Sequence, residues 1–220
     1  MTEKNIQTEA LFSFGESDLR GLLPYAHEKS YPKGEHIWQE GDDPDTIWLV
    51  RSGRVNMTIE SAEGATTIVH FYTQGQAFCP AATILRRSYP CSAVAATPLT
   101  LLAIPSSRFL ELFNRLPQLA KSLLLQMAPQ FCQAHCNCAI GNLPVKTRLA
   151  TLLSRLHRQF QGRQIPFTRQ ELANMSGTTV ETTIRTLSEW ERGGVIKSGR
   201  GAIHVEKPSA LQEALPDMEG

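Results

Sequence analysis

One segment constrains the fold most, because its sequence predicts two short helices joined by a tight turn. This segment is FTRQELANMSGTTVETTIRTLSEWERGG at 167–194. Thr168 precedes the first helix, and Glu171 follows three residues later, which is the spacing of a capping box. Gly177 supplies the backbone freedom that a tight turn needs. A small core can close between the two helices, formed by Leu172, Met175, Val180, Ile184 and Leu187. The pattern predicts a helix-turn-helix, whose second helix enters the major groove of DNA.

The segment VIKSGRGAIHV at 195–205 follows as two short strands around a Gly-rich turn, which is typical of a wing. Lys197 and Arg200 lie where they can meet DNA phosphate. Residues 144–207 carry eleven Lys and Arg against five Asp and Glu, a balance of +6, whereas residues 1–143 carry eleven against thirteen, a balance of −2. Helix-turn-helix shape also occurs in protein–protein modules, but the wing and the positive charge together favour DNA binding.

Residues 31–105 follow a different pattern, in which short apolar alternations are broken by Gly, Asp and Pro at near-regular intervals. Runs of about 4 to 8 β-branched and aromatic residues between such turns are typical of strands. We predict strands at 36–40, 46–50, 54–60, 66–72, 91–97 and 99–105. This succession predicts an antiparallel β-roll or barrel.

Helical spacing begins after this segment. Ser106 or Ser107 can cap a helix at 108–116. A further amphipathic helix, VKTRLATLLSRLHRQF at 145–160, places apolar residues on one face, namely Val145, Leu149, Leu152, Leu153 and Leu156. These helices lead from the predicted roll to the helix-turn-helix.

A longer helix is predicted at 117–140, opened by its proline and ended by Gly141. An apolar seam with alternating spacings of 4 and 3 residues runs along it, formed by Ala120, Leu124, Met127, Phe131, Ala134, Cys138 and Gly141. The seam predicts a two-helix coiled coil and hence a dimer; a helix packed on its own roll is the alternative, and both hold if they use different faces. Pro129 removes one backbone donor, so we expect a kink or local break there.

The chain resembles the CRP/FNR family of dimeric bacterial transcription regulators over about residues 15–207. Two segments carry the resemblance. The family's cyclic-nucleotide-binding type of β-roll is similar to GEHIWQEGDDPDTIWLVRSGRV at 34–55, and its DNA-binding signature is similar to FTRQELANMSGTTVETTIRTLSEWERGGVI at 167–196. The resemblance implies an α+β fold with an N-terminal helix, an antiparallel β-roll, a long dimerisation helix and a C-terminal winged helix-turn-helix. The expected domains are a sensor at 1–105, a dimerisation helix and hinge at 106–142, and a DNA-binding domain at 143–220.

The resemblance also implies roles around the second helix. Thr168 and Arg169 fall at phosphate-contacting positions, and Glu181 and Arg185 at the base-reading positions. The chemistry agrees, because an Arg fork suits guanine O6 and N7, a carboxylate accepts from cytosine N4, and Ile184 suits a thymine methyl. We expect a palindromic operator with TGA-type half-sites. The expected DNA-binding residues are Thr168, Arg169, Thr179, Val180, Glu181, Ile184, Arg185, Lys197 and Arg200.

Family members that bind cyclic AMP hold its phosphate with an Arg-Ser pair and its ribose with a Glu that follows a Gly. The resemblance puts Cys91 and Ser92, and Cys79 and Pro80, at these positions, and we expect both cysteines on strands that line the pocket. A cyclic phosphate buried without a counter-charge is costly, which argues against cyclic AMP. The two arginines at 86–87 lie nearby and supply positive charge, so a small anion stays a candidate ligand. The expected effector pocket comprises Cys79, Pro80, Cys91, Ser92, Ala134 and His135.

The stretch FCQAHCNC at 131–138 gathers three cysteines and a histidine. On a straight helix Cys138 lies roughly 120° from Cys132, so this stretch cannot wrap three thiolates around one ion, and a site needs ligands from elsewhere. Thiolates select iron–sulfur, zinc or copper(I), and the resemblance allows His135 or Cys79 to ligate haem iron instead. The FNR-type N-terminal cysteine cluster is missing, since the first cysteine is Cys79. The candidate metal ligands are Cys79, Cys91, Cys132, His135, Cys136 and Cys138; inert buried thiols and direct thiol oxidation are the alternatives.

The resulting hypothesis is a homodimeric regulator that senses redox state or a gas through Cys, His or a metal cofactor, with an iron–sulfur cluster or haem as the candidate. Duplex DNA and RNA polymerase are the expected partners. The sequence shows no signal-peptide pattern and no apolar run of roughly 18 residues, so we expect a cytoplasmic protein. No catalytic triad, phosphate loop or paired-carboxylate motif predicts an enzyme. The alternative is a regulatory module that binds a small ligand or a partner through the roll without cofactor chemistry.

Overall fold

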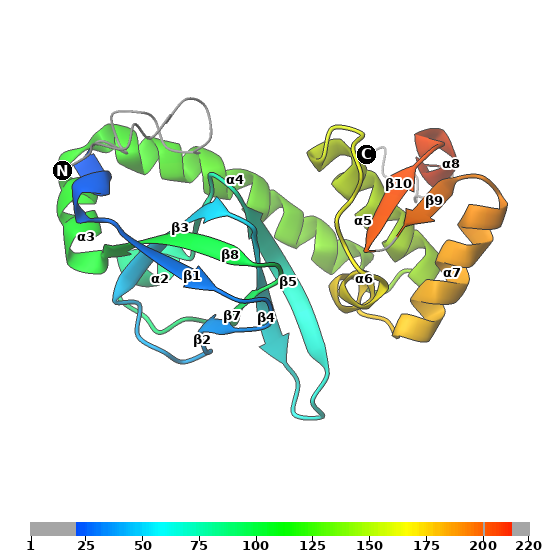
Figure 1. Cartoon of the computed structure of the whole chain (residues 1–220), viewed down its shortest axis with the longest axis horizontal. Coiled ribbons are helices and arrows are strands. Elements are labelled where there is room, and N and C mark those ends of the chain that lie inside the picture. Colours follow the sequence, from blue (N-terminus) through cyan, green and yellow to red (C-terminus); the bar gives the residue numbers. More distant parts are fainter. Residues whose placement is uncertain (1–20, 200, 213–220) are drawn as a thin grey trace. The chain divides into compact units, whose positions relative to one another are not determined.

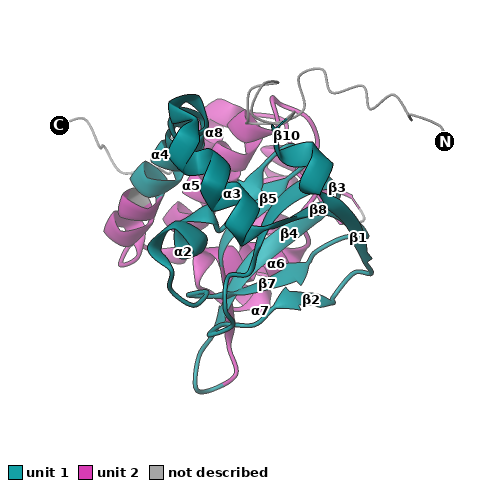
Figure 2. Cartoon of the chain, turned by 90° about the vertical axis from the view of Figure 1, so that its left-hand side faces the viewer, with its two compact units in different colours: residues 1–63, 69–133 teal, residues 64–68, 134–220 magenta. Residues whose placement is uncertain are grey.

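The computed structural model describes residues 21–199 and 201–212, apart from the side chain of Cys136. The chain divides into two compact units, coloured separately in Figure 2. The first comprises residues up to 63 and 69–133, and the second comprises 64–68 and the residues from 134 onward. Among the described helices, none is both long enough and apolar enough to cross a membrane.

The first unit is the predicted β-roll, built from two four-stranded sheets (Figure 1). One sheet has the strand order β1-β8-β3-β6, and the other has the order β2-β7-β4-β5. The strands are β1 (His27–Tyr31), β2 (His36–Trp38), β3 (Thr46–Ser52), β4 (Arg54–Glu60), β5 (Thr66–Thr73), β6 (Ala77–Phe78), β7 (Ser92–Ala95) and β8 (Leu99–Pro105), preceded by a short 3-10 helix, η1 (Leu23–Tyr25). The antiparallel pairing of β3 with β8 and of β4 with β7 confirms the predicted fold class.

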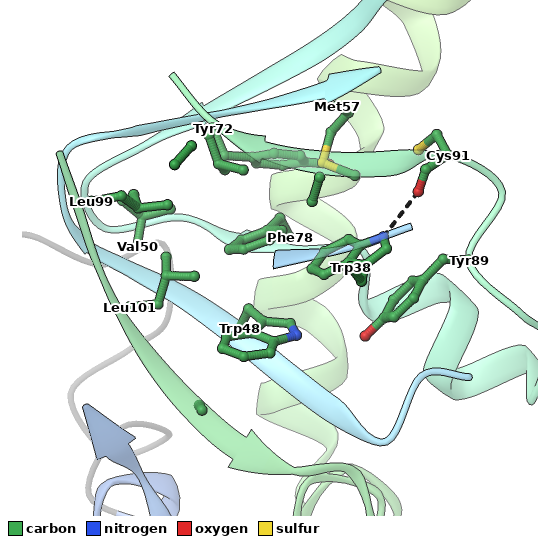
Figure 3. Close-up of a cluster of buried hydrophobic side chains, with 14 of the residues drawn as sticks. Trp38, Trp48, Val50, Met57, Tyr72, Phe78, Tyr89, Cys91, Leu99 and Leu101 are labelled. Atoms are coloured by element: carbon green, nitrogen blue, oxygen red, sulfur yellow. Dashed lines mark hydrogen bonds between the residues drawn. The ribbon is translucent and has the colours of Figure 1, made fainter. Parts of the chain in front are cut away.

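Aromatic rings fill the core of the roll, where residues from both sheets meet (Figure 3). Trp38 stacks on Tyr89 with ring centroids 4.0 Å apart and on Phe78 at 5.2 Å. These rings bury large apolar areas, which makes them the main contributors to core stability. Gly53 joins β3 to β4 with a φ of 89°, and a Cβ there would lie 2.4 Å from the carbonyl oxygen of Pro98, so only glycine fits.

Every predicted strand overlaps an observed one, but the segment between β5 and β7 differs from the prediction. It contains the short strand β6 and a helix, α2 (Pro80–Leu85), neither of which was predicted. Both elements are too short to show a period in the sequence. The expectation that Cys79 and Cys91 lie on strands is therefore wrong, because Cys79 is the N-cap residue of α2 and Cys91 directly precedes β7.

Two helices continue the chain from the roll, α3 (Ser106–Arg115) and α4 (Pro117–Ile140). A second apolar cluster joins them to the roll, formed by Leu22, Ile47, Leu49, Ala77, Leu102, Ile104, Phe109, Leu119 and Leu123. The predicted serine cap of α3 is wrong, because Pro105 is the N-cap and the Ser106 hydroxyl donates to the carbonyl oxygen of Pro44 at 2.6 Å. The expected local break at Pro129 is also wrong, since α4 continues through a residue that removes a single backbone donor, whereas the kink expected there stays a prediction.

The second unit contains the predicted winged helix-turn-helix. Its elements are α5 (Val145–Gln159), α6 (Arg169–Ser176), α7 (Val180–Arg192), β9 (Ile196–Gly199), β10 (Ala202–Val205) and α8 (Pro208–Gln212). The apolar face predicted for α5 is confirmed, because Leu149, Leu153 and Leu156 are fully buried. An isolated bridge between Ile165 and Ile203 ties the loop before α6 to the wing.

Candidate DNA-binding surface and signal pocket

The capping box predicted at the start of α6 is confirmed. The Thr168 hydroxyl accepts from the backbone N–H of Glu171 at 3.2 Å, and the Thr168 backbone N–H donates to the Glu171 carboxylate at 2.9 Å. At the other end of α6, Gly177 adopts a left-handed conformation with a φ of 60°, as the predicted turn requires. These local interactions fix the angle at which the chain enters α7.

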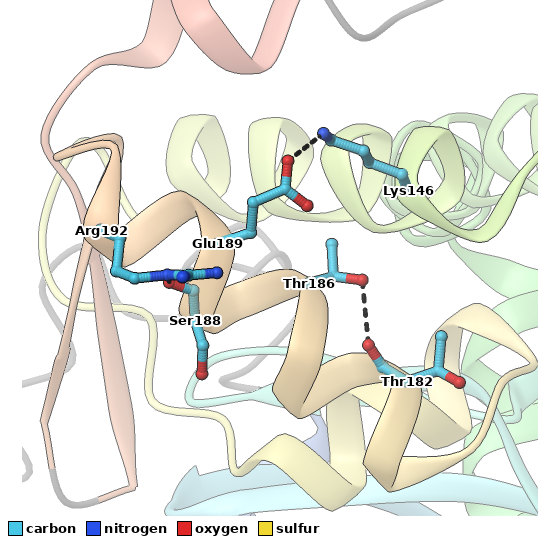
Figure 4. Close-up of polar contacts among 6 residues, drawn as sticks. All are labelled: Lys146, Thr182, Thr186, Ser188, Glu189 and Arg192. Carbon is cyan, nitrogen blue, oxygen red and sulfur yellow. Dashed lines mark hydrogen bonds and ion pairs between the residues drawn. The ribbon is translucent and has the colours of Figure 1, made fainter.

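Helix α7 begins at its own cap, where the Thr179 hydroxyl accepts from the backbone N–H of Thr182 at 3.2 Å. Two threonines on the inner side bond back along the helix: Thr183 donates to the Thr179 carbonyl oxygen at 3.0 Å, and Thr186 donates to that of Thr182 at 2.9 Å (Figure 4). The polar groups that α7 buries are thereby satisfied within the helix.

One side of α7 faces outward at its N-terminal end. Glu181 and Arg185 are exposed, and Ile184 is 39% exposed. The expected core position of Ile184 is therefore wrong, because the buried stripe runs through Thr183, Leu187 and Trp190 with spacings of 4 and 3. We call the outward set the reading face, formed by Thr179, Val180, Glu181, Ile184 and Arg185.

The C-terminal half of α7 makes one polar contact to α5 and one within α7 (Figure 4). Lys146 of α5 lies 2.6 Å from the Glu189 carboxylate, and this ammonium group lowers the pKa of the Glu189 carboxyl. Arg192 donates from Nε to the Ser188 carbonyl oxygen at 3.4 Å. Because both partners of the ion pair are about half exposed, it contributes little to stability, but it fixes the side of α7 that turns toward α5.

One arginine links the end of α4 to the turn before α7. The Arg148 guanidinium donates to the carbonyl oxygens of Gly141 and Leu143 at 3.1 and 2.8 Å, and to those of Ser176 and Gly177 at 2.9 and 3.0 Å. The sequence pattern missed this role, because it depends on carbonyl groups that only the folded chain brings together. Arg148 is one of three arginines on the amphipathic helix α5, and its spacing did not distinguish it from Arg155 and Arg158.

The predicted wing is confirmed as the antiparallel pair of β9 and β10. Lys197 is exposed on β9, and the backbone N–H of Ser198 donates to the Glu191 carboxylate of α7 at 2.8 Å. Arg200 lies outside the described residues. Arg169 is exposed at the first position of α6, so basic groups occur on both the helix-turn-helix and the wing.

In the roll, the two expected pocket cysteines lie together. Cys79 packs against the aromatic core that contains Cys91, and Cys91 is 7% exposed. The carbonyl oxygen of Cys91 accepts from Trp38 Nε1 at 2.9 Å (Figure 3), and the Ser92 hydroxyl accepts from the Glu40 backbone N–H at 3.0 Å. We call Cys79 and Cys91 the thiol pair.

The two thiols influence each other's ionisation. A hydrogen bond from the Cys79 thiol lowers the pKa of the Cys91 thiol, although burial opposes this shift. The same hydrogen bond, followed by burial, raises the pKa of the Cys79 thiol. When the pair loses one proton, Cys91 is therefore the sulfur that ionises, and Cys79 keeps its proton.

Tyr72 connects the thiol pair to α4. Burial, followed by the charges that Cys79 and Cys91 carry when ionised, raises the pKa of the Tyr72 hydroxyl. The hydroxyl donates to Oε1 of Gln130 on α4 at 3.0 Å. A change at the thiol pair thus has a short physical route to the long helix.

The remaining candidate ligands do not join the thiol pair in the part of the chain that is described. Cys132 and Cys138 are exposed on α4, as are Ala134 and His135. Within residues 21–199 and 201–212, no three His, Cys, Asp or Glu side chains come close enough together to hold a metal ion. An iron–sulfur cluster takes four thiolates. The described side chains bring together two, which do not fit such a cluster.

Comparison with known proteins agrees with this architecture. The family model "Cyclic nucleotide-binding domain" matches residues 28–116, and the model "Crp-like helix-turn-helix domain" matches residues 147–214. Together they cover well over half of the chain, in the order in which the roll and the winged module occur.

Relatives with both modules are known. The chain is 29% identical over 192 residues to the cyclic AMP receptor protein of Thermus thermophilus, covering 87% of this chain and 89% of that protein. It is 26% identical over 187 residues to the transcriptional activator protein Anr of Pseudomonas protegens, covering 81% and 76%. The solved structure of FixK2 from Bradyrhizobium japonicum matches the fold with a TM-score of 0.76 at 22% identity, covering 87% of this chain and 98% of that one. The chain belongs to the CRP/FNR family of DNA-binding transcriptional regulators.

Proposed function

We propose that this regulator is a homodimer that binds a palindromic operator and changes its operator affinity when the roll senses a signal. The reading face carries the proposal, because Glu181 and Arg185 are exposed on the first two turns of α7. An Arg fork and a carboxylate there suit a G·C pair, and Ile184 suits the methyl group of a neighbouring thymine. This combination supports TGA-type half-sites.

The other expected DNA contacts support the same proposal. Thr168 and Arg169 begin α6, where side chains and backbone N–H groups meet phosphate in helix-turn-helix proteins. Lys197 on the wing adds positive charge, and Arg200 is proposed to act with it. Phosphate contacts fix the register on the duplex, whereas the reading face selects the sequence.

Dimerisation is proposed through α4. Leu124 and Leu125 are each 66% exposed, and Phe131 is 69% exposed. Leu124 and Phe131 belong to the predicted seam, whereas Leu119 and Leu123 on a neighbouring face are buried against the roll. Large apolar side chains exposed at heptad spacing are typical of a helix that packs on a second copy. We propose the domains 1–105, 106–142 and 143–220 on this basis.

The signal is proposed to be a redox change or a diatomic gas. One relative is named a cyclic AMP receptor protein, but here Cys91 stands where the resemblance implies a phosphate-binding Arg, so a cyclic phosphate would lack its counter-charge. The name of the fumarate and nitrate reduction regulatory protein of Salmonella typhimurium, which is 23% identical over 192 residues, supports a link to a redox signal. Haem on Cys79 or His135 stays a candidate cofactor, and a roll that binds a small ligand without cofactor chemistry is the alternative.

A bound cofactor and a roll without a cofactor predict different absorption spectra. Anaerobically purified protein with a Soret or iron–sulfur absorption band would support a bound cofactor, whereas a colourless protein without metal would support thiol chemistry or a small ligand. The same proposal includes RNA polymerase as a partner, a cytoplasmic location and the absence of enzymatic activity. The names of the relatives, a receptor protein and a transcriptional activator, are in line with it.

Fluorescence anisotropy with labelled duplexes tests the proposal. A duplex with two inverted TGA half-sites, about 10 base pairs apart from centre to centre, is compared with a scrambled duplex of the same composition. We expect tighter binding to the palindrome, by roughly 10³-fold or more, and an affinity for both duplexes that falls steeply as salt increases. Equal or absent binding to both duplexes at low salt, in every redox state, would contradict the proposal.

A further inference from the structure

Cys79 and Cys91 meet although α2 and a turn separate them along the chain. Cys79 ends the segment after β6, and Cys91 begins the segment that becomes β7. Both side chains join one apolar cluster, in which Cys79 is partly buried and Cys91 is 7% exposed. One sulfur is thus more accessible from the surface, and the other lies beside it in the core.

The backbone at Cys79 adopts an uncommon conformation. Its φ of 51° and ψ of 33° lie in the left-handed region, which residues with a Cβ seldom occupy. The surrounding fold therefore compensates for this conformation, and the thiol meets Cys91 from it. The thiol pair combines contact, burial of one partner and access to the other.

We propose that the thiol pair is a modification site at which hydrogen peroxide forms a reversible disulfide between Cys79 and Cys91. This inference rests on the proposed function, because it names the site and the chemical class of the signal. It differs from the cofactor candidates in needing these two side chains and no bound metal.

The chemistry balances with one equivalent of peroxide. The Cys91 thiolate attacks one peroxide oxygen, the O–O bond breaks, and Cys91 becomes a sulfenic acid while hydroxide leaves. The Cys79 sulfur then attacks the Cys91 sulfur, the S–O bond breaks, and water leaves with the proton of the Cys79 thiol. The pair loses two electrons, and one hydrogen peroxide is reduced to one water and one hydroxide. The hydroxide takes up the proton that Cys91 lost on ionisation and becomes the second water. A dithiol reductant reverses the step by thiol–disulfide exchange.

Disulfide formation requires movement in the roll. The bonded sulfurs of a disulfide lie about 2.05 Å apart, closer than two packed thiols, so α2 or the start of β7 must shift when the bond forms. Tyr72 belongs to the apolar cluster that contains Cys91 and against which Cys79 packs, and its hydroxyl donates to Gln130 of α4 at 3.0 Å. The shift therefore reaches α4 through one side chain, which links oxidation to operator affinity.

Peptide mapping of the full-length protein tests the bond itself. Reduced protein is treated anaerobically with one equivalent of hydrogen peroxide, free thiols are alkylated, and peptides are identified by mass spectrometry. We expect a cross-linked peptide pair containing Cys79 and Cys91, abolished by dithiothreitol. The variant with Cys132, Cys136 and Cys138 all replaced by Ser should still form it. Alkylated Cys79 and Cys91 beside oxidised thiols elsewhere would overturn the inference.

Operator affinity in the same samples tests the link to function. We expect the Kd for the palindromic duplex to change by about 5- to 150-fold on oxidation, and to return on reduction. Cys79→Ser and Cys91→Ala should lose this change, with circular dichroism confirming that each variant is folded. A disulfide that leaves the Kd unchanged would refute the sensing role.

Failure of this inference and failure of the proposed function can be told apart. Palindrome binding without a disulfide would overturn the thiol site and leave DNA recognition intact. A disulfide in a protein that binds no duplex in either state would uphold the modification and refute operator binding.

Discussion

Arg185 lies on the exposed side of the second turn of α7, and we propose that it contacts a base edge. Arg185→Ala removes a fork that suits guanine O6 and N7. We expect a loss of about 1–3 kcal/mol on the palindromic operator and a relaxed preference at one base pair of each half-site. Competition with single-base variants of the duplex measures both effects. Equal losses on every duplex would show that Arg185 contacts phosphate instead.

Arg192→Ala is the matched control, because Arg192 is an exposed arginine at the other end of the same helix. It removes the same charge and a 3.4 Å contact to the Ser188 carbonyl oxygen. The base preference of this variant should stay as in the parent protein. Thermal unfolding of both variants separates loss of binding from loss of fold.

Residues whose roles are local were predictable, and residues whose roles depend on distant partners were not. Thr168 and Gly177 act within their own turns, so the spacing of the sequence predicts them. Ile184 was assigned to the core because apolar residues usually are buried, but it is exposed since Thr183 takes the inner position. The contact between Cys79 and Cys91 depends on α2, which the pattern did not show.

At the scale of elements, Arg148 ties the end of α4 and the α6–α7 turn to α5. Arg148→Ala removes charge-assisted hydrogen bonds to four carbonyl oxygens, and we expect the second unit to lose about 1.5–3 kcal/mol in free energy of unfolding. Urea unfolding measures the loss, and hydrogen exchange should accelerate at residues 141–148 and 173–180. Arg158→Ala, an exposed arginine on the same helix, serves as the control. Equal stability of the two variants would contradict this role.

Long elements with clear periods were predicted from the sequence. The 24 residues of α4 and the seven-residue, largely buried strands β4 and β8 leave little ambiguity. Short or exposed elements were missed, because β1 is mostly exposed, β6 has two residues and α2 has six. These elements form because neighbours supply hydrogen bonds and apolar surface, which no local pattern records.

At the scale of the whole molecule, α4 is the element at which the chain passes from the unit of the roll to the unit of the winged module. Its residues up to 133 belong to the unit of the roll, and its last turns belong to the unit of the winged module. The positive balance of residues 144–207 supports DNA contact by the second unit alone. A dimer through α4 would place one sensor and one reading face on each side of a two-fold axis.

Sedimentation of the protein with a duplex carrying two inverted TGA half-sites tests this account most directly. A two-fold dimer that reads DNA through α7 should place two chains on each duplex, and replacing one half-site should weaken binding by roughly 1–3 kcal/mol for each altered base pair that α7 reads. One chain per duplex, with equal affinity for the intact and the half-replaced operator, would contradict it.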